Sequence, residues 1–184
     1  MRKLLTLSIA LVALAGCDHM HKMMHGDKAA AAPPAPMVDT TADEAKIKAL
    51  TDQYVADVNA HNIDAIMSHY SNDVFVFDVV PPRQYVGVDA YRKDWEGLLN
   101  GFKTYKLDVS DLSVSSDGQM AWGHSIQHLV GTQVIKKKTV KVDLTVRVSD
   151  VYRKIGGDWK IVHEHVSVPV DLDHGARPDL QSKP

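Results

Sequence analysis

Histidine side chains that could bind a metal recur in the last third of the chain. His124 and His128 share one face of an expected strand, and His163 and His165 share one face of another. Residues two apart in a strand lie about 6.6 Å from each other, and residues four apart about 13 Å. A long strand is expected between the two strands that carry these histidines, which separates them further. Zinc needs every imidazole nitrogen about 2.1 Å away, which is hard to achieve from side chains so far apart. We therefore predict no metal site in the domain, and expect His124, His163 and His165, with Trp122, to line a binding pocket.

A second group of soft ligands lies near the start of the chain. Histidine and methionine crowd together at His19, Met20, His21, Met23, Met24 and His25. Imidazole and thioether groups suit copper. A solvated linker of biased composition is the simpler interpretation, and copper binding is the alternative.

Cys17 is the only cysteine of the chain, so no disulfide can form within it. It ends the sequence Leu14-Ala15-Gly16-Cys17, which follows a positively charged start and the apolar run 4–15. That run has the length of a signal-peptide core and is shorter than the roughly 20 residues of a spanning helix. The motif resembles the bacterial lipobox. The resemblance implies that residues 1–16 are a lipoprotein signal peptide and that Cys17 is lipidated.

A lipidated Cys17 implies a place in the cell envelope, with the lipid holding the chain to a membrane and the domain facing the periplasm. Asp18 follows the acylated position, and in some sorting systems an Asp there resembles an inner-membrane retention signal. Asp18 therefore favours the inner membrane, and the outer membrane stays open. Residues 17–40 are expected to be a flexible linker, because the His/Met tract is followed by an Ala/Pro-rich stretch without apolar periodicity.

The rest of the chain predicts one domain over residues 41–170 and a polar tail over 171–184. Thr41-x-x-Glu44 reads as a capping box, so a helix should begin there. A short second helix, a strand and a third helix are expected to follow over 63–70, 74–80 and 88–99. Alternating apolar residues then predict four strands over 105–114, 120–130, 139–154 and 159–168.

Helices followed by a strand meander predict an α+β fold with the helices on one face of the sheet. The longest strand would run about 53 Å if it were flat, so the sheet has to bend. We expect N-terminal helices packed in a strongly curved antiparallel sheet that forms a cone. The formal net charge of −2 argues against a nucleic-acid partner. The single basic run, Lys136-Lys137-Lys138, fits a solvated hairpin turn.

Two ordered stretches resemble the SnoaL-like members of the nuclear-transport-factor-2-like superfamily. One runs from Asn59-Ala60-His61-Asn62 into Tyr70-Ser71-Asn72-Asp73-Val74, and the other joins Asp150–Lys154 to Trp159–Pro169. The resemblance covers Asp43 to about Pro169. It implies a conical fold, and it includes the ketosteroid isomerases, which move a proton next to a carbonyl group.

For isomerase chemistry the resemblance implies three catalytic residues at matching positions. Asp78 would shuttle the proton, while Tyr54 and a protonated Asp150 would donate hydrogen bonds to the enolate oxygen. The local pattern partly supports this set, because Tyr54 shares the apolar stripe of its helix. Asp150 continues an apolar alternating row, where burial raises a carboxyl pKa. We therefore predict that the three side chains converge on one cavity.

Three functions stay open from the sequence. The first is a membrane-anchored domain that binds a small, mostly apolar molecule in a conical pocket, without a cofactor. The second is a ketosteroid isomerase-like enzyme that moves a proton α to a carbonyl. The third is a non-catalytic assembly module, which would form a homodimer through the exposed face of its sheet.

Overall fold

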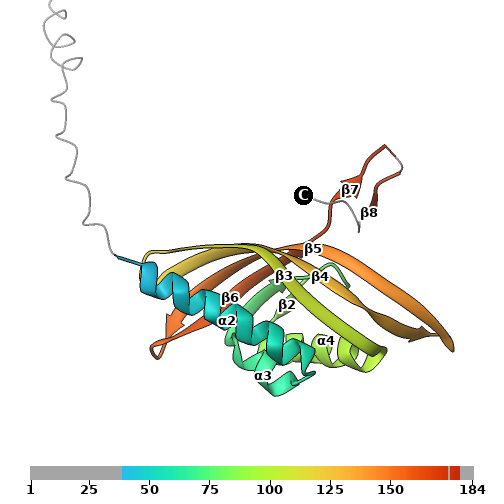
Figure 1. The fold of residues 1–184 in the computed structure, drawn as a ribbon, viewed down its shortest axis with the longest axis horizontal. Helices are drawn as coiled ribbons and strands as arrows, with labels where there is room; N and C mark the ends of the chain where they lie inside the picture. Colours follow the sequence, from blue (N-terminus) through green and yellow to red (C-terminus); the bar gives the residue numbers. More distant parts are fainter. Residues whose placement is uncertain (1–38, 174, 179–184) are drawn as a thin grey trace, which may run out of the picture. The chain divides into compact units, whose positions relative to one another are not determined.

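The computed structural model describes residues 39–173 and 175–178. Within them, helices come first and long strands follow, as expected (Figure 1). The predicted signal peptide, Cys17 and the tract from His19 to His25 lie outside the described residues. No helix among the described residues is long and apolar enough to cross a bilayer.

Three helices lie on one face of the sheet: α2 (Thr41–Asn59), α3 (Ile63–Ser68) and α4 (Val88–Gly101). Helix α2 turns Ile47, Thr51, Tyr54 and Val58 toward the sheet, and this spacing of three and four residues marks one helical face. That face places the phenol of Tyr54 in the protein interior.

The start of α2 differs from the expected capping box. The helix begins at Thr41, but its N-cap is Thr40, which makes no side-chain cap hydrogen bond. The Thr40 hydroxyl instead donates to the Glu44 carboxylate at 3.1 Å. A capping box needs the acid three residues after the cap, and Glu44 is four residues after Thr40, so the prediction of a box at Thr41 was wrong.

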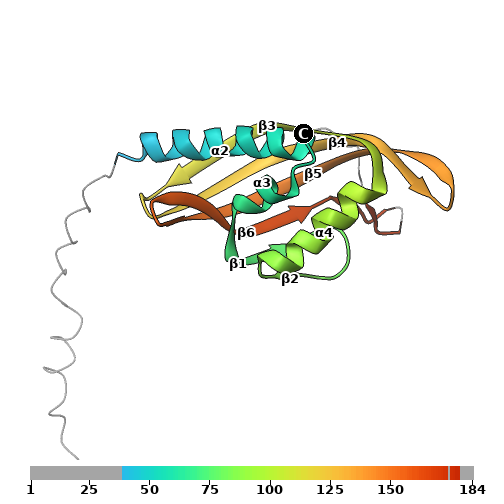
Figure 2. The same ribbon diagram turned by 90° about the horizontal axis from the view of Figure 1, so that it is seen from below.

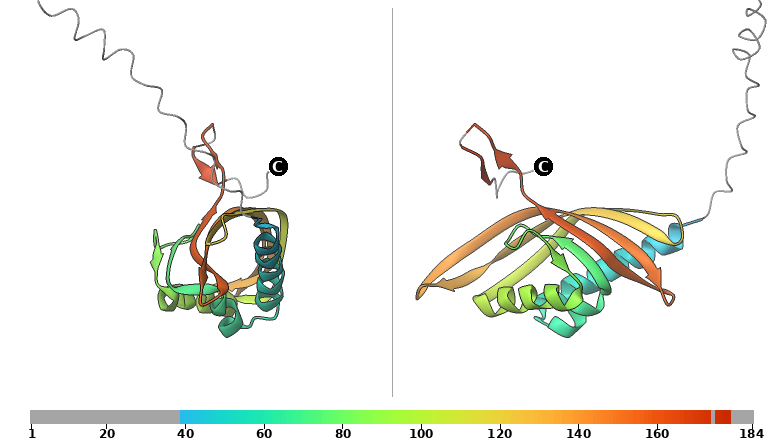
Figure 3. Two further views of the ribbon diagram at one scale, coloured as in Figure 1. Left: turned by 90° about the vertical axis from the view of Figure 1, so that its left-hand side faces the viewer. Right: turned by 180° about the vertical axis from the view of Figure 1, so that it is seen from behind.

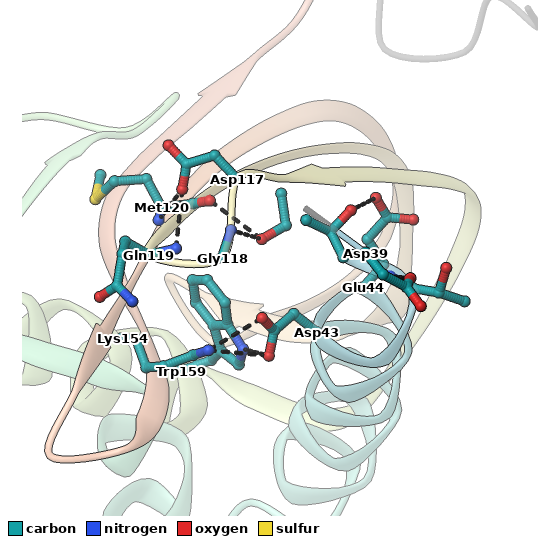
Figure 4. Close-up of polar contacts among 12 residues, drawn as sticks. Asp39, Asp43, Glu44, Asp117, Gly118, Gln119, Met120, Lys154 and Trp159 are labelled. Carbon is teal, nitrogen blue, oxygen red and sulfur yellow. Dashed lines mark hydrogen bonds and ion pairs between the residues drawn. The ribbon is translucent and has the colours of Figure 1, made fainter. Parts of the chain in front are cut away.

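Asp43 ties the first turn of α2 to the far hairpin of the sheet (Figure 4). Its carboxylate accepts from Lys154 Nζ at 3.0 Å and from Trp159 Nε1 at 3.3 Å. The Lys154 ammonium also lies 4.9 Å from the centre of the Trp159 ring. These contacts join α2 to strands that are distant in sequence and so help to set where Tyr54 lies, three turns further along the helix.

The main sheet has six strands in the order β2-β1-β6-β5-β4-β3. Their bounds are β1 (Tyr70–Phe77), β2 (Tyr85–Val86), β3 (Phe102–Ser116), β4 (Met120–Ile135), β5 (Lys138–Ile155) and β6 (Asp158–Ser167). The α+β fold with helices against a large curved sheet is confirmed. One pair departs from the antiparallel prediction, because β1 runs parallel to β6. No tight turn joins these two strands, so nothing imposes the antiparallel direction of a hairpin.

The strands curve as they pass the helices, and Figures 2 and 3 show this bending from three sides. Irregular pairing accompanies it: β3 and β4 shift register between Phe102 and Thr104 and again between Ser110 and Ser113. At the first shift Gly131 permits a close approach, since a Cβ there would stand 2.3 Å from the Thr104 carbonyl oxygen. Bulges of this kind increase bend and twist.

Two surface features complete the fold. Lys136 and Lys137 form the β4–β5 turn with positive φ angles of 48° and 66°, and both are exposed, which confirms the predicted solvated turn. Part of the expected polar tail is ordered into strands, since β7 (Val170–Asp171) pairs with β8 (Arg177–Pro178).

Candidate functional site

A cavity of about 110 Å³ lies between α2, α4 and the inner face of the sheet. Most of its wall is apolar, formed by Val79, Val80, Leu98, Leu107, Leu129, Leu144, Val146 and Val166. The remaining lining residues are aromatic or polar: Tyr54, Asp78, Tyr91, Trp95, Tyr105, Gln127 and Glu164. Two larger grooves, of about 440 and 480 Å³, are open to solvent and contain no buried carboxyl group.

Glu164 is the buried charge-bearing group of this cavity, with only 3% of the residue exposed. The Tyr70 hydroxyl donates to its Oε2 at 2.9 Å, and the Tyr91 hydroxyl donates to its Oε1 at 2.5 Å. Burial raises the pKa of Glu164 to about 8, and the neighbouring Asp150 carboxyl adds to the rise. The two tyrosine hydrogen bonds act in the opposite direction.

A bulge in β6 turns Glu164 inward. Tyr152 pairs with Ile161 and Val151 pairs with His163, so Val162 has no partner in the ladder. Trp159 and Ile161 face the core before the bulge, and Glu164 faces it afterwards. Strict alternation would place Glu164 on the opposite face from Ile161. Sequence reasoning missed Glu164 for this reason, and an acid in the middle of an otherwise core-forming strand was the only local signal.

Tyr54 lies in the cavity wall, and its hydroxyl is 3.4 Å from that of Tyr70. Its ring meets the Trp95 ring edge-to-face, with centroids 6.1 Å apart. Burial raises the pKa of Tyr54 well above its ordinary value, and Glu164 adds to the rise. Tyr54 is therefore a neutral phenol joined to Glu164 through Tyr70.

Asp78 also lines the cavity, one residue after the end of β1 rather than on the strand as expected. Its Oδ1 accepts from the backbone N–H groups of Val79 at 2.5 Å and Val80 at 3.4 Å. Its Oδ2 lies 3.5 Å from the Tyr91 hydroxyl. Burial raises the pKa of Asp78 above its ordinary value, with a further contribution from Asp94. The Tyr91 hydroxyl thus stands between the carboxyl groups of Asp78 and Glu164.

Asp150 is buried on the inner face of β5, directly opposite Glu164 on β6. Its Oδ2 accepts from the Tyr152 hydroxyl at 3.1 Å, while its Oδ1 has no hydrogen-bond partner among the described residues. Burial raises the pKa of Asp150 to about 7. Asp150 is not part of the cavity wall. The cavity therefore brings Tyr54 and Asp78 together with Glu164, and Asp150 stands next to Glu164 instead of beside the ligand space.

Four expected pocket residues lie elsewhere. Trp122 and His124 project from β4 on the side opposite Ala121 and Ser125, which are buried, and Trp122 is 47% exposed. His163 Nδ1 lies 2.7 Å from the Phe75 carbonyl oxygen, and the ring of His165 packs against Phe77. The prediction that these four line the pocket was wrong, since strand alternation turns Trp122 and His124 outward and the β6 bulge turns His163 and His165 outward.

No group of three or more metal-type side chains comes together among the described residues. Tyr70 and Tyr91, which bond Glu164, were not singled out as site residues from the sequence. The sequence predicts a helix that includes Tyr70, whereas Tyr70 is the first residue of β1. An apolar pattern alone does not distinguish a core tyrosine from one that serves a site.

The comparisons agree with this architecture. Residues 47–171 match the family model of the SnoaL-like domain. A nuclear-transport-factor-2-like protein of unknown function from Pseudomonas putida KT2440 is 26% identical, with a TM-score of 0.68, over 78% of this chain and 98% of that one. A search of curated proteins gave no match.

Two further solved structures share the fold at lower identity. A nuclear-transport-factor-2-like superfamily protein from Salmonella enterica serovar Typhimurium is 19% identical over 74% of this chain and 97% of that one, with a TM-score of 0.63. A ketosteroid isomerase-like protein from Erwinia carotovora atroseptica is 20% identical over 68% of this chain and 95% of that one, with a TM-score of 0.57. At these identities the likeness concerns the fold alone.

Proposed function

Because this chain belongs to the SnoaL-like domain family, we propose that its domain binds a small, mostly apolar molecule in the cavity, with Glu164 as the polar anchor. A single observation carries the proposal: a buried carboxyl group, bonded by two tyrosine hydroxyls, stands in the wall of a mostly apolar cavity. Concave, largely apolar sites with few convergent polar groups are typical of small-molecule binding.

The cost of burying Glu164 supports a functional role. Removing a carboxyl group from water destabilises the folded state, and an apolar side chain of similar size would avoid that cost. Asp78 and Asp150 add two further carboxyl groups with raised pKa values nearby. Strongly perturbed acids gathered at a cavity are a feature of functional sites.

The size of the cavity limits the ligand. A dry cavity of about 150 Å³ holds one benzene ring, so a space of about 110 Å³ suits a compact group of that order. Val79 and Val80 belong to the wall and are 38% and 42% exposed, so they stand where the cavity meets solvent. A longer ligand would extend past these two residues.

The test uses a panel of single-ring compounds and the full chain, with binding followed by calorimetry at pH 9, above the pKa of about 8 of Glu164, where its carboxyl group is mostly ionised. Glu164→Gln keeps the shape of the side chain but removes its charge, and Glu96→Gln makes the same change at an exposed position of α4. A charge-assisted hydrogen bond contributes about 1.5–3 kcal/mol, so Glu164→Gln should weaken binding by about 10- to 100-fold. Equal affinities for the parent, Glu164→Gln and Glu96→Gln would contradict the proposal.

A second candidate function is isomerase-like proton transfer. It is favoured by the position of the Tyr91 hydroxyl, which lies 3.5 Å from Asp78 Oδ2 and donates to Glu164. Asp78 would accept the proton from the carbon next to a carbonyl, and the Tyr54 hydroxyl in the same wall would donate to the oxygen. Exchange of deuterium from water into the α-position of a small cyclic ketone, followed by NMR, tests this activity. Asp78→Asn should abolish the exchange and leave ketone binding nearly unchanged.

We also propose that Cys17 carries a lipid and that the domain is held at the periplasmic side of a membrane. The support is the sequence Leu14-Ala15-Gly16-Cys17 after a short apolar run. A homodimer through the outer face of the sheet stays compatible with ligand binding. Phe77 and Trp122 are exposed on that face, and the cavity lies on the opposite one.

A further inference from the structure

The acids around the cavity have no basic partner among the residues that the structure describes. None of the residues that line the cavity is Lys, Arg or His, while Asp78 and Glu164 are both acids. The ion pairs within the described part of the chain use other carboxylates: Asp43, Asp57, Asp64, Asp73, Asp108 and Asp143. Buried acids are ordinarily paired, so the positive charge that would complete this site is missing from its wall.

Hydrogen-bond directions at the site suit the ionised form of each acid, which a bound cation would stabilise. Glu164 accepts from Tyr70 and from Tyr91, so both of its oxygens already receive a donor. Asp78 accepts from two backbone N–H groups. An ionised carboxylate is an acceptor only. These donors compensate part of each negative charge, and the lone pairs that remain can receive a donor from a ligand.

Aromatic rings supply a second, independent feature. Four of the lining residues are aromatic, namely Tyr54, Tyr91, Trp95 and Tyr105. Tyr91 and Trp95 come from adjacent turns of α4, and their rings meet at a centroid distance of 6.3 Å. Ring faces carry a negative quadrupole and attract organic cations, as in the aromatic cages that bind quaternary ammonium groups.

We propose that the ligand of this cavity is a small organic cation, a protonated amine or a quaternary ammonium group on an apolar body. Its positive group pairs with Glu164 and Asp78, and its apolar part contacts the Leu and Val side chains of the wall. This inference rests on the proposed function, because it names the class of molecule that the cavity binds.

Proton release on binding distinguishes a cation from a neutral ligand. The titratable groups around Glu164 are all acids or phenols. They are Tyr54 from α2, Tyr70 from β1, Asp78 after β1, Tyr91 and, beyond Asp78, Asp94 from α4, and Asp150 and Tyr152 from β5. Burial and Asp150 raise the pKa of Glu164 to about 8. A cation stabilises the ionised form, so binding near pH 7 should release a proton, and affinity should rise with pH up to about 8.

The experiment compares benzylamine, which is protonated in this range, with its neutral isostere benzyl alcohol. Calorimetry of the full chain in two buffers of different ionisation enthalpy gives both the affinity and the number of protons exchanged. We expect benzylamine to bind at least about 10-fold more tightly and to release close to one proton at pH 7. Glu164→Gln should remove both effects, and Glu96→Gln should keep them.

The outcomes separate this inference from the proposed function. If benzyl alcohol binds as tightly as benzylamine or more tightly, or if benzylamine binding takes up protons, the cation inference is overturned while the cavity remains a binding site. If neither compound binds to the parent chain, the proposed function fails together with the inference. If benzylamine binds to Glu164→Gln as tightly as to the parent, the Glu164 carboxylate is not the anchor of the ligand.

Discussion

Asp150 on β5 and Glu164 on β6 are direct cross-strand partners, and both carboxyl groups are buried on the inner face of the sheet, at 8% and 3% exposure. Two like charges so placed oppose each other's ionisation, because little water separates them. The Asp150 carboxyl accordingly adds to the raised pKa of Glu164. The two acids should therefore titrate as a linked pair.

The linked pair predicts how stability depends on pH. The pKa of Glu164 is about 8 in the folded protein and 4.5 as its ordinary value, so the folded state holds this proton more tightly than the unfolded state does. Its stabilising contribution is complete below about pH 4.5 and is lost as pH rises through about 8. Urea denaturation from pH 4 to 9 should show the free energy of unfolding of the parent falling relative to that of Glu164→Gln.

Asp150→Asn provides the matched test of the pair. Removing this neighbouring acid should lower the pKa of Glu164. The pH-dependent loss of stability should then have its midpoint at a lower pH than in the parent. A pH profile of Glu164→Gln that parallels the parent from pH 4 to 9 would show that Glu164 does not titrate as described.

Tyr91→Phe should destabilise the protein by about 1–3 kcal/mol, because it leaves an oxygen of a buried acid without its hydrogen-bond donor. Tyr105→Phe is the matched control, since Tyr105 is also largely buried but its hydroxyl bonds no other described residue. Urea denaturation measures both variants. If Tyr91→Phe lowers the free energy of unfolding no more than Tyr105→Phe does, the hydrogen bond from Tyr91 to Glu164 contributes nothing to stability.

Two glycines should respond in opposite directions to alanine. At Gly131 a Cβ would stand 2.3 Å from the Thr104 carbonyl oxygen and 2.8 Å from the Phe102 ring, so Gly131→Ala should cost about 1–3 kcal/mol through overpacking. Gly97 lies within helix α4 with nothing near its Cβ position. Gly97→Ala should therefore stabilise the domain by about 0.5–1 kcal/mol. Melting temperatures that move in the same direction for both variants would contradict this reading.

The sequence predicted the three helices and the long strands of the fold, because each of these has a local signature. The stripe of Ile47, Tyr54 and Val58 identified the first helix, and the alternation leading to Val146 and Val148 identified the long strand and the inward side of Asp150. The parallel pairing of β1 with β6 has no such signature. It depends on where the chain returns after β5, which local patterns do not encode.

The site was less predictable for a related reason. Alternation assigns faces only while a strand is regular, and the extra residue Val162 reverses the faces that follow it. That one bulge places Glu164 inside and turns His163 and His165 out. Tyr54 and Asp78 were found because the resemblance supplied their positions, and the cavity brings both of them close to Glu164.

Cys17→Ser tests the membrane anchor. If Cys17 is the acylation site, this variant should lose its lipid and move from the membrane fraction to the soluble fraction. Ser115→Ala, an exposed change in β3, should leave the fractionation of the chain unaltered. A Cys17→Ser chain that still partitions with membranes as the parent does would refute the lipoprotein proposal.

The titration of the Glu164 carboxyl carbon, followed by ¹³C NMR with and without benzylamine, shows directly whether Glu164 is the buried anchor of the ligand site. The signal is assigned by its disappearance in Glu164→Gln. We expect a midpoint of about 8 in the free protein and a markedly lower midpoint when benzylamine is bound. A midpoint near 4.5, the ordinary value for glutamate, that benzylamine leaves unchanged would contradict the claim that Glu164 is the buried anchor of the ligand site.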